Sequence, residues 1–430
     1  MTNERYGLIK NIRLMDPVSQ RTEATDLLYL QKEGKSTVLQ MGKGLKAPQR
    51  DGLTVTNMHG APACPAFTDL RCAHPETELE YRESLQSCLL AAAAGGFARI
   101  LTRPQRIGAD SPQKYENMVK NAAKAADCRL FPTVPVTLGG RGETLSPFEA
   151  LREKGALAIS ADLEKKELSG KLYLAALEES KRLQMLFIAP CHEKSLSGSG
   201  VNKGRISARL KEEGEDGAAE LLALSRALML AHLQNAPVHF PLVTLKESVT
   251  LIRTAKRAGV PISCATAPPY FSLTESELLF IGENARLSPP LRSEEDRAAV
   301  IEGLVDGTID CICSDHTPLS DREKTGGKGT LPGAVGLETV FAAGVTHLVL
   351  PGYLSLYKLL ELISLAPAAL LGIDAQIKEG GALNLAFIDS DSELVYNHHS
   401  MRSRSHNTPF YGRALLGRVT GLYIDGVRQS

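Results

Sequence analysis

The feature that most constrains the fold is an alternation of short apolar runs with helical segments between residues 66 and 350. The apolar runs have the length of buried strands, and the intervening segments repeat apolar residues at helical spacing. The strand candidates are 66–70, 98–102, 130–135, 156–160, 185–189, 238–243, 262–266 and 310–314. The helix candidates include 81–95, 112–126, 170–183, 217–233 and 246–258. Eight strands with crossover helices over roughly 250 residues predict an α/β fold, a (β/α)8 TIM barrel.

The two ends of the chain have a different pattern. Residues 1–60 and 378–430 contain short strand-like runs between glycines and turn residues, such as LIKNIRLMD and VTGLYIDG. These flanks predict one small β-sandwich domain formed by both termini, with the barrel occupying residues 61–377. The 430 residues are sufficient for both parts.

Composition limits the partners and the location of the protein. Lys and Arg together number 49, as do Asp and Glu, so no charge excess points to nucleic acid or a membrane surface. The N-terminus lacks a signal-peptide core, and runs such as CLLAAAA (88–94) are too short to cross a bilayer. We expect a soluble, cytoplasmic protein. Its eight scattered cysteines are expected to be reduced and mostly buried.

Two polar, glycine-rich segments follow predicted strands. Segment 193–216 comes after the fifth strand and segment 317–333 after the eighth. Loops at the carboxyl ends of barrel strands build the active face of such folds. We therefore expect both segments at this face, with disorder as the alternative.

Several motifs resemble dihydroorotase of the amidohydrolase superfamily, and together they cover nearly the whole chain. They are PAFTDLR, EYRESLQSCLLAAAAGGFARIL, SPPLRSEEDRAAVIEGLVDGTIDCICSDHTP, PGAVGLET and SRSHNTPFYGRALLGRV. The resemblance implies a barrel with a small β-sandwich and one or two Zn²⁺ ions at its C-terminal face. It also implies reversible cyclisation of carbamoyl-aspartate in pyrimidine biosynthesis, and a homodimer.

The resemblance also identifies the positions of the family's metal ligands. Where the family carries Asp-x-His-x-His after the first strand, this chain has Arg71 and Ala73 in place of the histidines. Pro190 and Leu242 replace the histidines of the fifth and sixth strands. The aspartate of the eighth strand is retained as Asp315. We therefore expect most metal ligands to be lost, no bound metal, and Asp315 to be a vestigial catalytic residue.

Residues that hold the substrate in the family have changed as well. Pro75 replaces an arginine, Gln105 and Ser288 replace asparagines, and Leu319 replaces a histidine. The expected remnants of the substrate pocket are Arg71, Gln105, Ser288 and His316. The motifs that shape the backbone persist while side chains that touch metal or substrate differ, and this combination predicts a pseudoenzyme.

The metal is essential to the family's chemistry. A bound metal lowers the pKa of water from 15.7 to about 7, whereas an aspartate base has a pKa near 3.9. Deprotonating free water with aspartate is uphill by roughly 16 kcal/mol, against roughly 4 kcal/mol for metal-bound water. Without the metal, the reaction has no plausible nucleophile.

A cation could replace the charge of the metal without its catalysis. Arg71 takes the first ligand position, and Asp315 is expected to point at the same barrel mouth. A buried aspartate without a partner is costly, and guanidinium matches carboxylate geometry. We therefore predict an ion pair between Arg71 and Asp315.

The competing hypothesis is a metal site rebuilt from new ligands near the strand ends. The candidates are Cys72, His74, Cys191, His192, Cys264, Cys311, Cys313 and His316. Thiolate and imidazole suit Zn²⁺, but cysteine is also among the most buried residue types. His192 is one residue out of register, so we expect it to point away from the site unless the strand is bulged. His239 is expected to be a core histidine, and Asp315 remains a candidate base for a metal-free reaction.

The resemblance suggests a role without catalysis. Non-catalytic dihydroorotase-like chains of this family associate with aspartate transcarbamoylase and hold its catalytic trimers in a larger assembly. A structural subunit of this kind is the first hypothesis. The alternatives are an active cyclic amidohydrolase with a displaced metal or another substrate, and a ligand-binding sensor that keeps the pocket without turnover.

Overall fold

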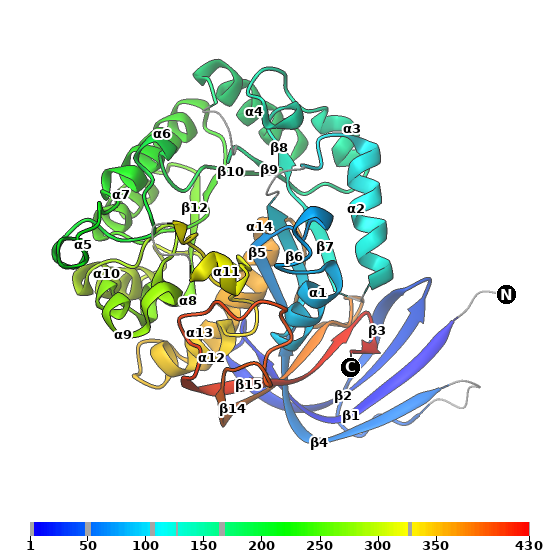
Figure 1. Ribbon diagram of the computed structural model, residues 1–430. Coiled ribbons are helices and arrows are strands. Elements are labelled where there is room, and N and C mark those ends of the chain that lie inside the picture. Colours follow the sequence, from blue (N-terminus) through cyan, green and yellow to red (C-terminus); the bar gives the residue numbers. More distant parts are fainter. Residues whose placement is uncertain are drawn as a thin grey trace.

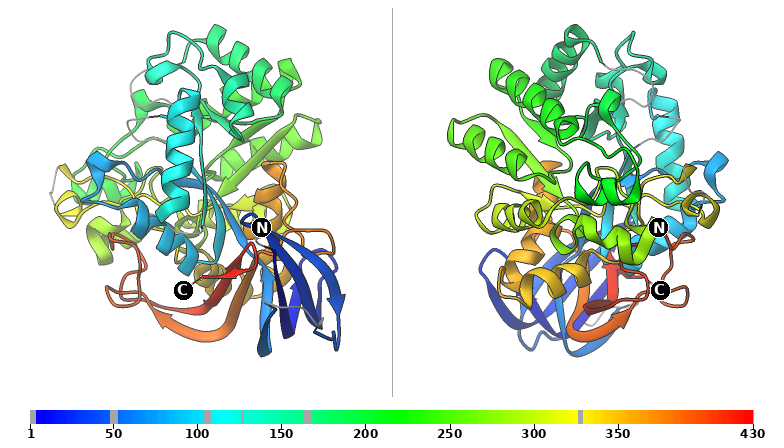
Figure 2. Two further views of the ribbon diagram at one scale, coloured as in Figure 1. Left: turned by 90° about the vertical axis from the view of Figure 1, so that its right-hand side faces the viewer. Right: turned by 60° about the vertical axis from the view of Figure 1, so that its left-hand side comes forward.

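The computed structural model describes residues 4–47, 53–103, 108–125, 128–162, 168–325 and 329–429 (Figure 1). The fold confirms the predicted α/β class. A barrel of parallel strands occupies the middle of the chain, and a separate sheet lies at one end of it (Figure 2). Both termini belong to this sheet (Figure 2).

The barrel strands coincide with the eight predicted runs. They are β5 (Phe67–Ala73), β6 (Phe97–Arg103), β7 (Arg129–Pro132), β8 (Val134–Pro135), β9 (Ala158–Ser160), β10 (Leu186–Ile188), β11 (Val238–Phe240), β12 (Ile262–Thr266) and β13 (Cys311–Ile312). β7 pairs with β6, and β8 pairs with β9, so these two short strands share one barrel position. The barrel closes where Cys72 in β5 bridges to His316 after β13.

Helices cover the outside of the barrel. The principal ones are α1 (Leu85–Ala94), α2 (Pro112–Ala125), α3 (Phe148–Glu153), α4 (Gly170–Leu183), α6 (Ala218–Gln234), α7 (Lys246–Arg257) and α10 (Glu294–Val305). Shorter ones are α5 (Arg205–Leu210), α8 (Pro268–Ser272), α9 (Leu278–Ile281), α11 (Asp321–Lys324), α12 (Val340–Gly344), α13 (Leu356–Leu360) and α14 (Ala366–Leu370). Among the described residues, no helix combines the length and apolar character needed to cross a membrane.

The separate sheet combines the two ends of the chain, as predicted. Its strands are β1 (Arg5–Asp16), β2 (Arg21–Lys32), β3 (Lys35–Gly42), β4 (Thr54–Pro65), β14 (Leu385–Val395), β15 (Ala414–Ile424) and β16 (Val427–Arg428). Their order is β16-β15-β14-β4-β1-β2-β3. β4 is therefore the strand at which the N-terminal and C-terminal halves of the sheet meet. The exact domain boundaries at 60/61 and 377/378 remain predictions.

The C-terminal tail motif, SRSHNTPFYGRALLGRV, is hydrogen-bonded to segments at the barrel mouth. The Asn407 amide nitrogen donates to the carbonyl oxygens of Thr317 and Gly333, each at 3.0 Å, and its oxygen accepts from Leu319 N. The Ser405 hydroxyl donates to the carbonyl oxygen of Arg82. The tail motif therefore has a structural role at the barrel, although it lies outside the barrel in the sequence.

The PGAVGLET motif has a packing reason. A Cβ atom on Gly336 would lie 2.0 Å from the carbonyl oxygen of Ser314. Gly336 N also donates to Nδ1 of His316 at 3.2 Å. Only glycine permits this close approach beneath the turn that carries Asp315.

Candidate functional site

A cavity of about 290 Å³ lies at the carboxyl ends of the barrel strands, and we call it the mouth cavity. Arg71 and Arg103 come from β5 and β6, and Asp162, His192 and Lys194 follow β9 and β10. The remaining lining residues are Ser288, Thr317, Pro332 and Gly333. Both predicted loops, 193–216 and 317–333, thus contribute to this face, which confirms that expectation. Of the lining side chains in the described ranges, four are basic or can carry a proton, against one carboxylate.

Arg71 forms the predicted ion pair with Asp315. Nε of Arg71 donates to Oδ1 of Asp315 at 2.8 Å, and the two side chains are 6% and 15% exposed. Nη2 of Arg71 also donates to the sulfur of Cys191 at 3.4 Å. Burial lowers the pKa of Arg71, but the surrounding Cys191 and Asp315 outweigh it and raise the pKa overall. The guanidinium is therefore held as a fixed cation in the barrel mouth.

The backbone around β13 positions Asp315 for this contact. Asp315 has a φ of 47°, a left-handed conformation that aspartate tolerates better than most residues. The preceding Ser314 is fixed by Asp69, whose carboxylate accepts from Ser314 N at 2.7 Å and from its hydroxyl at 2.6 Å. Asp69 is fully buried in β5 and is occupied by these bonds. Its task is to hold the two edges of the barrel together.

The other charges of the mouth cavity are only partly paired. Nζ of Lys194 lies 3.4 Å from Oδ1 of Asp162. Burial raises the pKa of Asp162, but Lys194, Arg71 and Arg103 together bring it down to about 2. The Cys191 sulfur, 3.2 Å from Nδ1 of His192, is the main cause that raises the pKa of His192 to about 9, against the effect of burial. At neutral pH the cavity therefore presents an excess of positive charge.

The structure brings some of the predicted pocket residues together and separates others. Arg71 and Ser288 both line the mouth cavity, and Asp315 contacts Arg71. His316 is not among the lining residues, because its ring faces Glu83, with Nε2 3.4 Å from Oε2. Gln105 lies outside the described residues.

One prediction about register was wrong. We expected His192 to point away from the site, but it lines the mouth cavity. The alternation of side chains holds only within a strand, and β10 ends at Ile188. Arg103, Asp162 and Lys194 were missed altogether. Each lies at or just after the carboxyl end of a barrel strand, and this position was the signal that could have identified them.

The proposed replacement ligands do not gather at one point. The Cys72 sulfur lies 3.8 Å from that of Cys88, and Nδ1 of His74 lies 2.9 Å from the hydroxyl of Thr102. Cys313 is directed at backbone carbonyls. All eight cysteines are free and buried, as expected. Within the described ranges, no three histidine, cysteine or acidic residues are placed to share a metal ion.

His239 lies in the barrel interior, as predicted, and gives the protein a specific response to acid. It is 1% exposed, and its Nδ1 lies 3.0 Å from the Ser263 hydroxyl. Burial and then the charge of Arg71 lower the pKa of His239 to about 3. An unfolded histidine titrates near 6.5. The native state therefore binds fewer protons than the unfolded state between these values, and stability falls as the pH drops below 6.5.

We expect His239 to account for a loss of about 3 kcal/mol between pH 6.5 and pH 4, at about 1.4 kcal/mol per pH unit. The measurement is urea denaturation at a series of pH values for the natural protein and His239→Gln. The variant should show a shallower decline by that slope. Replacement of the exposed His399 by glutamine serves as the control and should leave the slope unchanged. Equal slopes for the natural protein and His239→Gln would contradict the assignment.

Comparisons with known proteins agree with this architecture. Residues 38–428 match the sequence profile of the Amidohydrolase family. The dihydroorotase of Geotalea daltonii is 35% identical over 422 residues, covering 97% of each chain. This chain belongs to the amidohydrolase family. Among other relatives of this family, the dihydroorotase of Citrifermentans bemidjiense is 36% identical over 423 residues, covering 97% of this chain and 98% of its own.

Solved structures support the family fold. The L-hydantoinase (dihydropyrimidinase) of Arthrobacter aurescens superposes with a TM-score of 0.83 at 21% identity, covering 98% of this chain and 95% of its own. A D-hydantoinase (dihydropyrimidinase) from Thermus sp. has a TM-score of 0.79 at 19% identity, covering 98% and 94%. At such identities the likeness establishes the amidohydrolase fold with its barrel and β-sandwich, and nothing further about activity.

Proposed function

We propose that this chain is a non-catalytic dihydroorotase homologue of pyrimidine biosynthesis that acts, as a homodimer, as a structural partner of aspartate transcarbamoylase. The single observation that carries the non-catalytic part is the ion pair between Arg71 and Asp315. It occupies the barrel mouth, where the resemblance to dihydroorotases predicts a metal.

The residues present do not fit a zinc ion at this position. Zinc binds neutral imidazole, thiolate or carboxylate groups. Guanidinium is always charged and has no lone pair to donate, so Arg71 cannot replace an imidazole ligand. One oxygen of Asp315, the retained carboxylate, already accepts from Arg71. Ala73, Pro190 and Leu242, which stand at other ligand positions, offer no donor atom.

The chemical consequence is a missing nucleophile. Asp315 would have to deprotonate free water, which costs roughly 16 kcal/mol in the proton transfer alone. Its Oδ1 also accepts from Arg71 Nε at 2.8 Å, so this oxygen is already occupied. Arg71 thus supplies the positive charge that a metal would supply, but it cannot activate water as a metal does.

A second candidate function is an active cyclic amidohydrolase with a rebuilt metal site. The observation that favours it is the contact of 3.2 Å between the Cys191 sulfur and Nδ1 of His192, since thiolate and imidazole are good zinc ligands. Arg71 Nη2 donates to the same sulfur at 3.4 Å, and this places a positive charge beside any metal bound there. We therefore rank this candidate second.

Metal analysis and a hydrolysis assay separate the two candidates. We expect protein purified from zinc-supplemented medium to contain far less than one zinc per chain and to hydrolyse no dihydroorotate. The Geotalea daltonii dihydroorotase, prepared in the same way, is the matched reference. Stoichiometric zinc together with turnover would overturn the non-catalytic proposal. Loss of that zinc in Cys191→Ser would then locate the rebuilt site.

The partnership is tested separately. We expect this chain and the aspartate transcarbamoylase of the same organism to elute as one complex on size-exclusion chromatography with light scattering. The chain alone should elute with the mass of a dimer. Independent elution of the two proteins would refute the structural role and favour a ligand-binding sensor instead.

A further inference from the structure

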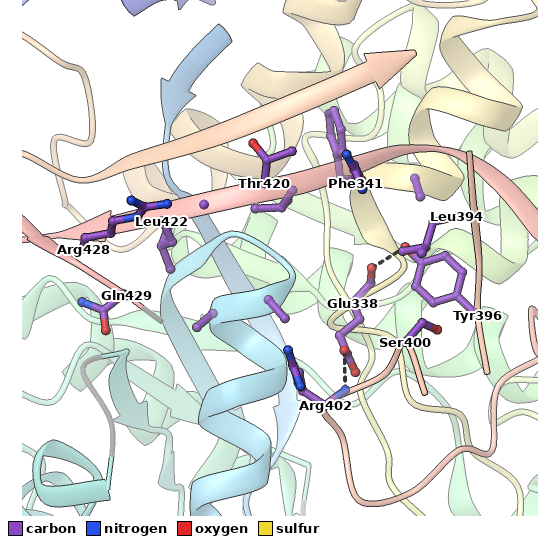
Figure 3. A pocket seen from close by; sticks show the side chains of 16 residues that line it. Glu338, Phe341, Leu394, Tyr396, Ser400, Arg402, Thr420, Leu422, Arg428 and Gln429 are labelled. Carbon is purple, nitrogen blue, oxygen red and sulfur yellow. Dashed lines mark hydrogen bonds between the residues drawn. The ribbon is translucent and has the colours of Figure 1, made fainter. Parts of the chain in front are cut away.

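A second cavity shares no lining residue with the mouth cavity, and we call it the arginine pocket (Figure 3). It has a volume of about 540 Å³. The C-terminal end of α1, the start of α12, strands β14 and β15, and the chain segment after β14 all contribute to its lining. It therefore lies at the junction between the separate sheet and the barrel helices. Nothing in the proposed function uses this pocket.

The charge of the arginine pocket comes from three guanidinium groups, those of Arg402, Arg418 and Arg428. Arg418 has a weak partner, with Nε 3.9 Å from Oδ2 of Asp389. Among the described residues, the side chains of Arg402 and Arg428 have no acidic partner. Figure 3 shows Arg428 and Gln429 on one side of the pocket and Arg402 with Ser400 on the other. A ligand that fills the space would thus meet donors at both ends.

Two features place negative charge at the pocket and would disfavour a bound anion. Neither outweighs the positive charge of the three arginines. Among the described residues, the lining contains one carboxylate, Glu338, whose oxygens accept from Arg402 N at 2.7 Å and Ser403 N at 3.1 Å. The Glu338 carboxylate therefore interacts with two backbone N–H groups. The C-terminal end of α1, at Ala93 and Ala94, adds the equivalent of about half a negative charge. Three guanidinium groups leave a net positive pocket.

The donors favour phosphate over a simple carboxylate. A phosphate group carries a charge of about −1.5 to −2 and three strong acceptor oxygens. Arginine pairs with such a group through two parallel hydrogen bonds. Thr420 and Gln429 supply further neutral donors at the same lining. Three arginines exceed what one carboxylate needs.

The size and the apolar part of the lining indicate more than inorganic phosphate. A volume of about 540 Å³ lies in the range of pockets that hold whole small molecules. Leu394, Val419 and Leu422 provide apolar surface between the charged ends. We propose that the arginine pocket binds a phosphate-bearing small molecule of mononucleotide size.

The test is isothermal titration calorimetry of the full chain at low salt. The probes are adenosine monophosphate, uridine monophosphate, inorganic phosphate and succinate. We expect at least one mononucleotide to bind more tightly than inorganic phosphate and succinate. Arg402→Gln and Arg428→Gln should each weaken this binding about tenfold, since hydrogen bonds to charged groups have this magnitude. Higher salt should also weaken it.

A matched control removes the same charge elsewhere. Arg257→Gln changes an exposed arginine at the end of α7 and should leave the affinity unaltered. All these positions are on the surface, so the variants should fold, and their thermal unfolding verifies this. Absence of binding at millimolar concentrations would overturn the proposal. Equal affinity in Arg402→Gln and Arg428→Gln, or succinate binding as tightly as the mononucleotides, would overturn it as well.

Discussion

Replacing Arg71 by methionine is expected to lower the free energy of unfolding by about 3–5 kcal/mol, because the substitution leaves a buried carboxylate without its partner. Asp315 is 15% exposed at its side chain and cannot recover full hydration. Methionine keeps much of the length of the arginine stem, so the cavity term is small. Urea denaturation at pH 7 measures the change.

Two further variants isolate the electrostatic contribution of the pair. Adding Asp315→Asn to Arg71→Met should restore most of the lost stability, since no unpaired charge then remains. Lys203→Met is the control, because its ion pair with Asp216 is at the surface, with side chains 65% and 50% exposed. We expect it to cost less than about 1 kcal/mol. If Arg71→Met costs no more than Lys203→Met, the ion pair does not stabilise the barrel mouth.

Replacing Glu83 by leucine should be similarly costly, at about 3–5 kcal/mol. The Glu83 carboxylate is 1% exposed and accepts from the hydroxyls of Ser87 and Ser403 and from Arg404 N at 3.0 Å. Its Oε2 also lies 3.4 Å from Nε2 of His316. Without the carboxylate, these buried donors have no hydrogen-bond acceptor. Chemical denaturation gives the energy, and limited proteolysis reports whether residues 397–412 detach.

The pH dependence of this substitution supplies an independent readout. Burial raises the pKa of Glu83, but its bonds to His316, Ser403 and Ser87 lower it overall. The stability from Glu83 is therefore present above the unfolded glutamate pKa of about 4.3 and is lost as the pH falls below it. The free energies of unfolding of Glu83→Leu and of the natural protein should therefore become more similar as the pH falls below about 4.3. Glu393→Leu, at an exposed position of β14, should change stability by at most about 0.5 kcal/mol. Equal effects of the two variants would refute the role of Glu83.

Much of the fold could be predicted because burial dictates it locally. Most residues of the strands from β5 to β13 are buried, as expected of a parallel sheet covered on both faces. The helices α4 and α7 match their predicted ranges closely because their apolar residues recur at helical spacing. In α4 the side chain of Ser169 also caps the N-terminus by accepting from Leu172 N. The sequence has no signal for the division of one barrel position into β7 and β8, because Thr133 between the two strands is as buried as its neighbours.

The candidate sites were less predictable because they join distant segments. The pairing of Arg71 with Asp315 could be anticipated, since both follow from strand ends that meet in a barrel. His192 was misjudged, because its position depends on coil beyond β10 that no periodicity describes. The arginine pocket could not be foreseen. Its arginines lie between residues 402 and 428, whereas α1 and Glu338 come from elsewhere in the sequence.

The position of β4 in the sheet has a consequence for synthesis of the protein on the ribosome. β4 pairs with β1 on one side, while its other neighbour is β14, with Leu385 opposite Pro65. The partner emerges 320 residues later (385 minus 65). At about 5–20 residues per second, one edge of β4 waits roughly 16–64 s for its neighbour. The nascent chain thus carries an open strand edge through about three quarters of its translation, and an exposed edge of this kind is a site that chaperones protect.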